Sequence, residues 1–118
     1  MKNNEKKENY LEKVPVRPSR FTWTEEDGIV TFHIENRGFF KRITQILIKK
    51  PKVSHIHLDE LGSFIWLQID GEQTLVEIGE RLLEHFGDKA KPVYERLSKF
   101  FYMLESYKFI DWKEKTVI

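Results

Sequence analysis

The chain has 118 residues and a formal net charge of +1, which suits one domain and excludes a global charge that would mark nucleic acid or a membrane surface as the partner. Hydrophobic residues make up 40% of the sequence and aromatic residues 14%, so the chain can bury a core and is not wholly disordered. The sequence has no cysteine, which excludes disulfides, thiolate metal sites and thiol catalysis and fits a reducing compartment.

Residues 1–14 are predicted to form a flexible charged tail. Residues 1–13 contain seven charged side chains of both signs, a composition with little to bury. The tail lacks the apolar stretch of a secretory signal. No apolar run in the sequence approaches the roughly 20 residues of a spanning helix. We therefore expect a cytoplasmic protein with a single domain from residue 15 to residue 118.

Residues 20–35 predict an antiparallel β-hairpin. Both halves alternate apolar and polar residues, and Val30, Phe32 and Ile34 share one face at a period of two. The turn is expected at residues 25–28, Glu-Glu-Asp-Gly, because Asp-Gly is a strong hairpin signal.

Residues 37–52 are predicted to be a basic insertion. Between residues 36 and 58 the chain has six Lys or Arg and no Asp or Glu. The apolar spacing within residues 36–52 favours a short helix, although the β-branched content also permits a strand.

The sequence VSHIHLD, residues 53–59, predicts a short strand. Ile56 and Leu58 are expected on one face. The side chains expected on the opposite face are those of Val53, His55 and His57.

Two of these histidines have a spacing that can bind a metal. His55 and His57 are two residues apart on one strand face. The other histidines, His33 and His85, have no evident reason to converge on them. We therefore interpret His55 and His57 as edge-strand residues and predict no metal site.

Two helices are predicted after this strand by their end signals. Asp59 can cap the first helix, which stops at residues 70–71, Asp-Gly. Thr74 and Glu77 form a capping box for the second helix, which ends at Gly87.

A third helix is expected from Pro92, which suits the first turn of a helix. Residues 109–113, FIDWK, alternate again and predict a possible final strand. The order indicates an α+β fold with an N-terminal three-stranded antiparallel β-sheet followed by three α-helices. This order is the winged helix-turn-helix pattern.

The order and spacing of these pieces resemble the PqqD-like family, from about residue 15 to residue 112. No single piece is diagnostic, because most are helix caps and core positions. The matching pieces are IHLD at 56–59, GSFIW at 62–66, IDG at 69–71, TLVEI at 74–78 and YKFI at 107–110.

The sequence shows no Ser–His–Asp arrangement with positional support, no phosphate-binding glycine loop and no metal motif, so we expect neither catalytic activity nor a cofactor. The resemblance implies a protein that binds the leader segment of a ribosomally synthesised precursor peptide. It implies that the leader adds as a β-strand and is presented to a modifying enzyme, often a radical S-adenosylmethionine (radical SAM) enzyme. The edge strand and the third helix would supply the contacts. The residues expected to bind the peptide are Lys52, Val53, His55, Ile56, His57, Tyr94, Leu97, Phe101 and Tyr102.

Other interpretations stay open. A winged-helix DNA-binding regulator is the alternative function, but Glu77, Glu80 and Glu84 on the second helix would repel phosphate. A purely structural or dimerisation domain is a third possibility. The basic insertion could form a rim for an acidic leader, contact nucleic acid or membrane, or be an ordinary solvated surface. We expect a monomer or weak dimer and no nucleic-acid or membrane partner.

Overall fold

The computed structural model describes residues 10–35 and 53–114. The chain divides into two compact units. We call Ser19–Ser63 the sheet unit, and Met1–Pro18 together with Phe64–Ile118 the helical unit. The predicted short helix within residues 36–52 and the site residue Lys52 lie outside the described residues. None of the helices in the described parts of the chain is long and apolar enough to cross a membrane.

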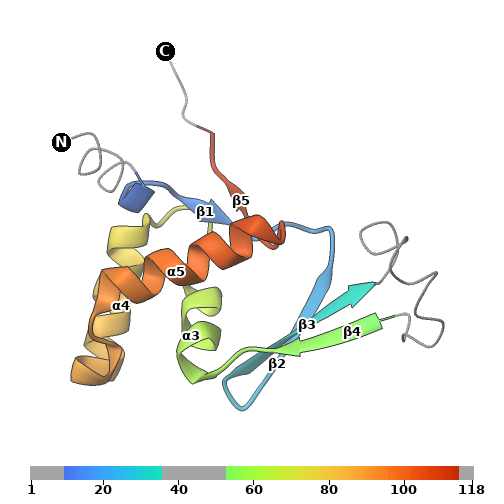
Figure 1. Ribbon diagram of the computed structural model, residues 1–118, viewed down its shortest axis with the longest axis horizontal. Coiled ribbons are helices and arrows are strands. Elements are labelled where there is room, and N and C mark those ends of the chain that lie inside the picture. Colours follow the sequence, from blue (N-terminus) through green and yellow to red (C-terminus); the bar gives the residue numbers. More distant parts are fainter. Residues whose placement is uncertain (1–9, 36–52, 115–118) are drawn as a thin grey trace. The chain divides into compact units, whose positions relative to one another are not determined.

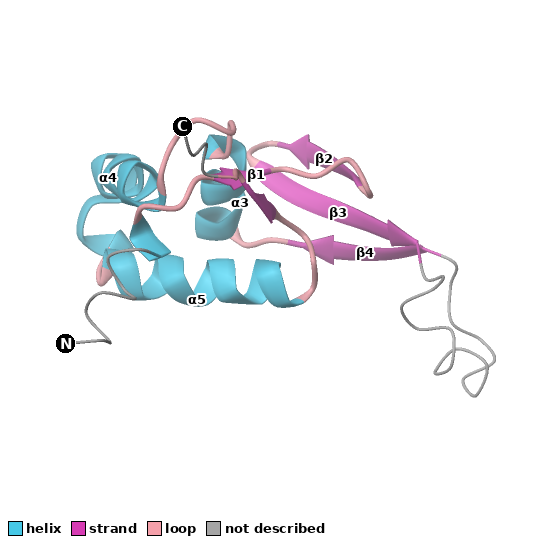
Figure 2. Ribbon diagram, turned by 90° about the horizontal axis from the view of Figure 1, so that it is seen from above, coloured by secondary structure: helices cyan, strands magenta, loops and turns pink. Residues whose placement is uncertain are grey.

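The sheet unit contains a three-stranded antiparallel sheet in the order β2-β3-β4 (Figures 1 and 2). Its strands are β2 (Thr22–Glu26), β3 (Ile29–Glu35) and β4 (Val53–His57). Helix α3 (Glu60–Gln68) follows the sheet in the sequence. With α4 (Leu75–Phe86) and α5 (Val93–Ser106) of the helical unit, this order confirms the predicted α+β fold of a three-stranded sheet and three helices. The winged helix-turn-helix likeness stays a prediction.

The predicted hairpin is confirmed, and its turn is Asp27-Gly28. Glu26 pairs with Ile29, so the loop has two residues. Asp27 has φ +53° and Gly28 has φ +82°, the positive values that a type I′ turn requires. The Glu25 carboxylate accepts a 2.6 Å hydrogen bond from the Gly28 N–H.

Local hydrogen bonds connect the sheet to the start of α3. The Asp59 carboxylate accepts from the Gly62 N–H at 2.7 Å, which confirms the predicted cap. The buried Ser63 hydroxyl accepts from the Val30 N–H at 2.8 Å. Because Val30 is fully buried, this bond satisfies a main-chain donor that water does not reach.

The helical unit contains α4 (Leu75–Phe86), the 3-10 helix η1 (Gly87–Ala90) and α5 (Val93–Ser106). The predicted capping box of α4 is confirmed: Thr74 accepts from the Glu77 N–H at 3.2 Å, and the Glu77 carboxylate accepts from the Thr74 N–H at 2.8 Å. Gly87 ends the helix with φ +62°. The fully buried side chains of the two helices are Leu75, Ile78, Leu82, Leu97, Phe101 and Leu104.

A second sheet, of two strands, joins the N-terminal and C-terminal segments of the helical unit. β1 (Pro15–Val16) pairs antiparallel with β5 (Asp111–Trp112), and the two strands lie side by side in Figure 1. The possible final strand at 109–113 is therefore confirmed. Its partner β1 was not predicted, because a two-residue strand that contains proline has no periodic signal.

Residues 10–14, assigned to the tail from the sequence, make contacts within the helical unit. The Tyr10 ring stacks on Tyr102 with centroids 4.7 Å apart and meets the edge of Trp112 at 5.5 Å. The Lys13 ammonium lies 5.4 Å from the centre of the Tyr10 ring and 5.0 Å from that of Trp112. The Lys13 carbonyl accepts from the Leu75 N–H at 3.1 Å.

These contacts predict an alkaline loss of stability. Burial raises the pKa of the Tyr10 hydroxyl, and the charges of Glu105 and Tyr102 raise it further. The unfolded chain then ionises Tyr10 at a lower pH, about 10, than the folded chain does. The stabilising contribution of neutral Tyr10 is present below that pH and is lost as the pH rises above it.

Tyr10→Phe should therefore flatten the fall in unfolding free energy between about pH 9 and pH 11, measured by urea denaturation. Part of the slope should remain, because burial and Glu80 raise the pKa of Tyr94 as well. Tyr107→Phe, at an exposed tyrosine, is the matched substitution. An equal flattening in both variants would contradict the prediction.

Candidate edge-strand site

The outer edge of β4 is the first candidate site. β4 is terminal in the sheet order, and no strand among residues 10–35 and 53–114 pairs with its outer edge. The Leu58 N–H donates to the Val30 carbonyl at 2.9 Å, toward β3. Main-chain groups of an antiparallel strand alternate in direction. The N–H and C=O groups of Val53, His55 and His57 therefore point away from β3.

The side chains of β4 leave part of this strand open to solvent. Val53 and Ser54 are half-buried, whereas His55 and His57 are exposed. Ile56 has 37% of its surface exposed although it pairs with the fully buried Phe32. An extended chain that paired with this edge would find an apolar side chain on one face and two imidazoles on the other.

Helix α5 holds the other four residues predicted to contact a peptide, and they divide into two pairs. Leu97 and Phe101 are fully buried, whereas Tyr94 is 38% exposed and Tyr102 is 60% exposed. The spacing of four between Leu97 and Phe101 puts them in the buried stripe of the helix. Only the two tyrosines therefore present surface that a partner can touch directly.

Both tyrosines already have neighbours within the helical unit. The Tyr94 hydroxyl donates to the Val76 carbonyl at 3.4 Å. The Tyr102 ring stacks on Tyr10. The contact with Tyr10 was missed because the sequence of residues 1–13 is dominated by charge, and a single tyrosine within it carries no periodic signal.

The exposed face of the sheet gathers three histidines, which corrects one expectation. The sequence shows no evident reason for His33 to converge on His55, but the register places the two directly opposite each other on β3 and β4. Their Nδ1 atoms are 2.8 Å apart. The Thr24 hydroxyl lies 2.9 Å from His33 Nε2, and the Thr31 hydroxyl lies 2.8 Å from His57 Nδ1.

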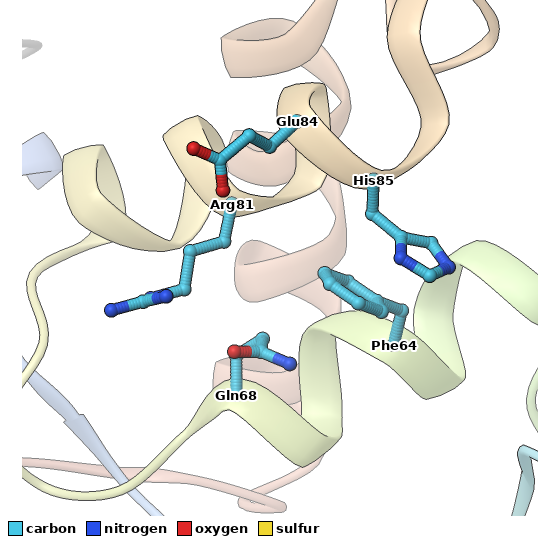
Figure 3. A pocket seen from close by; sticks show the side chains of 5 residues that line it. All are labelled: Phe64, Gln68, Arg81, Glu84 and His85. Atoms are coloured by element: carbon cyan, nitrogen blue, oxygen red, sulfur yellow. The ribbon is translucent and has the colours of Figure 1, made fainter.

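A pocket of about 320 Å³ lies between α3 and α4 within the helical unit (Figure 3). Its lining residues are Phe64, Gln68, Arg81, Glu84 and His85. The rings of Phe64 and His85 stack with centroids 4.6 Å apart. Arg81 Nε donates to the Gln73 side chain at 2.6 Å. Four of the five lining side chains are polar, so the pocket lacks the apolar lining typical of small-molecule sites.

The chain was compared with known families, curated proteins and solved structures. The family model described as Coenzyme PQQ synthesis protein D (PqqD) matches residues 29–110. The chain belongs to the PqqD family. No curated protein and no solved structure matches it.

Membership of the PqqD family confirms the resemblance seen in the sequence and supports a role in binding a ribosomally synthesised precursor peptide. Proteins of the family are accessory proteins that bind a precursor peptide and partner enzymes. The match covers β3, β4 and all three helices, and so includes the edge strand and both exposed tyrosines.

Proposed function

We propose that this PqqD-family protein binds the leader segment of a precursor peptide by β-strand addition to the outer edge of β4. It then presents the bound peptide to a modifying enzyme, such as a radical SAM enzyme. The observation that carries the proposal is the position of β4 at the end of the sheet order. An exposed edge offers main-chain donors and acceptors that an extended peptide can satisfy.

The main chain supplies affinity with little sequence preference. Val53, His55 and His57 each direct one N–H and one C=O outward. This follows because the Leu58 N–H points toward β3 and main-chain groups alternate in direction along the strand. A net hydrogen bond contributes about 1 kcal/mol, and micromolar binding needs about 8 kcal/mol. Main-chain pairing alone therefore does not reach that affinity after the ordering cost of the peptide.

Side chains must supply the remaining affinity and the specificity. The exposed Ile56 is one apolar contact on β4. Tyr94 and Tyr102 of α5 are the further contacts that we propose, because large aromatic side chains provide contact area at low entropic cost. Leu97 and Phe101 are buried beneath this helix surface, so we propose that they support the tyrosines without touching the peptide.

The DNA-binding alternative gains no support from α4. Glu80 and Glu84 are exposed on this helix, and the Arg81 side chain donates to Gln73. The two exposed carboxylates repel a phosphate backbone, and the guanidinium of Arg81 is already hydrogen-bonded within the protein. We therefore keep peptide binding as the single proposed function.

Strand addition predicts that proline at position 55 should impair binding more than alanine does. His55→Pro removes an outward-pointing N–H, which an edge strand can lose while its pairing with β3 remains. His55→Ala removes the same imidazole but keeps that N–H. We expect the proline variant to bind a synthetic leader peptide at least about tenfold more weakly than the alanine variant, since 1.4 kcal/mol corresponds to a factor of ten.

The measurement is isothermal titration calorimetry in metal-free buffer with synthetic peptides that carry the leader segments of candidate ribosomal precursor peptides. Amide chemical shifts of β2 and β3 in both variants establish that the sheet is intact. Equal affinity of the two variants, with intact sheets, would overturn strand addition at this edge. Adding a modifying enzyme that acts on the bound precursor, and comparing its turnover with each variant, then tests presentation separately from binding.

A further inference from the structure

The geometry points to a binding site for a divalent transition-metal ion of tetragonal preference, such as Cu²⁺ or Ni²⁺, between His33 of β3 and His55 of β4. The site lies wholly within the sheet unit, on its exposed histidine face. It does not depend on the proposed peptide-binding function. Its ligands would be the two Nδ1 atoms, with solvent completing the coordination.

The distance between the two nitrogens fits this class of ion. His33 Nδ1 and His55 Nδ1 are 2.8 Å apart, and their rings meet edge to face with centroids 4.9 Å apart. Two nitrogens that each lie about 2.0 Å from one ion at right angles are about 2.8 Å apart. A tetrahedral zinc site would separate them by about 3.3 Å.

The sheet register holds the two imidazoles in place. His33 and His55 are directly opposite each other. The Leu58 N–H bonds to Val30 across the same two strands, and hydrogen-bonded and non-hydrogen-bonded pairs alternate along an antiparallel ladder. His33 and His55 are therefore a non-hydrogen-bonded pair. Side chains are closest in pairs of this kind. A ligand pair on adjacent strands is therefore organised before the ion arrives, which lowers the entropic cost of binding.

The Thr24 hydroxyl is placed to hold the His33 ring in its orientation. His33 Nε2 lies 2.9 Å from the Thr24 hydroxyl. When Nε2–H donates to this oxygen, the lone pair of His33 is placed on Nδ1, which is the atom facing His55. Metal-binding histidines commonly donate their second N–H in this way. With this tautomer of His33, the 2.8 Å contact is a hydrogen bond that His55 Nδ1–H donates to His33 Nδ1. Metal binding requires His55 to carry its proton on Nε2 instead.

His57 provides a matched control on the same strand and face. Its Nδ1 is 2.8 Å from the Thr31 hydroxyl and is therefore engaged away from the pair. Among the described residues, no group of three or more His, Asp or Glu is placed to hold a metal ion. We therefore assign two protein ligands, His33 and His55, to the site and do not count His57 among them.

The test titrates Cu²⁺ into the untagged full chain and into His33→Gln, His55→Gln and His57→Gln variants, followed by calorimetry. One equivalent should bind the wild type. Loss of either imidazole of the pair should weaken Cu²⁺ binding by roughly a hundredfold, because two linked binding groups can raise the affinity by that factor over one group alone. The His57→Gln variant should bind like the wild type, and Thr24→Val should bind about tenfold more weakly.

A measurement on the wild type alone guards against misfolded variants. Electron paramagnetic resonance of the Cu²⁺ complex should show coupling to two imidazole nitrogens, and paramagnetic broadening of amide signals should centre on His33 and His55. Coupling to one nitrogen, broadening elsewhere, or equal affinity of the His33→Gln and wild-type proteins would overturn the site.

Discussion

Replacing Phe101 with alanine is expected to lower the free energy of unfolding by about 3–5 kcal/mol, the usual cost of deleting a buried phenylalanine. Phe101 is fully buried on α5 and packs near Trp112, with ring centroids 6.0 Å apart. The substitution removes this contact area and leaves a cavity that the surrounding helices fill only in part. Urea denaturation followed by tryptophan fluorescence measures the effect.

The adjacent Tyr102→Ala variant is the matched control. Tyr102 is 60% exposed and loses mainly its stacking on Tyr10. We expect this change to cost only about 0.5–1.5 kcal/mol. Equal losses in the two variants would contradict the assignment of Phe101 to the core.

The same pair of residues separates packing from peptide contact. Phe101→Leu keeps an apolar core side chain and should leave the affinity for the leader peptide nearly unchanged. Tyr102→Ala should weaken the peptide complex if the tyrosine touches the peptide as proposed. The reverse result would show that α5 presents a different face to the partner.

The second large effect is expected at Gly79, where α4 packs against α5. A Cβ atom added there would lie 2.6 Å from Tyr94 Cε1 and 2.9 Å from Leu97 Cδ1. Both distances are shorter than van der Waals contact allows. Leu97 is fully buried and cannot move aside without disturbing the core.

Gly79→Ala is therefore expected to lower the free energy of unfolding by about 1–3 kcal/mol through overpacking. Helix propensity alone predicts the opposite sign, a gain of roughly 1 kcal/mol for alanine over glycine within a helix. Denaturation midpoints of wild type and variant decide between the two. Glu80→Ala, at the exposed neighbouring position, should change stability by less than about 0.5 kcal/mol.

A double-mutant cycle tests the mechanism at Gly79. Tyr94→Ala removes the side chain nearest to the added methyl group, so the second substitution should cost less in that background than in the wild type. Strictly additive losses would mean that the destabilisation does not arise from contact with Tyr94.

The helix boundaries were predictable because their signals are local. The Thr74–Glu77 capping box and the stop at Gly87 each depend on residues within one turn of the helix. The Asp27-Gly28 turn is equally local, since only two residues must adopt positive φ.

The candidate site was predictable in part. Periodicity placed β4 after the hairpin, and a three-stranded order leaves β4 at an edge. The buried side of α5 was harder, because Tyr94, Leu97, Phe101 and Tyr102 all fit an amphipathic pattern. The packing of α5 on α4, with Gly79 against Tyr94 and Leu97, buries Leu97 and leaves Tyr94 partly exposed.

By itself, the sequence determined the α+β class, the hairpin, the helix ends and the likeness to the PqqD family, because caps, turns and periodicity act between neighbouring residues. Only the tertiary structure decided that His33 meets His55 and that β1 pairs with β5. These contacts join residues 22 and about 96 positions apart along the chain. Pairings of that separation depend on strand register and packing, for which local sequence carries no signal.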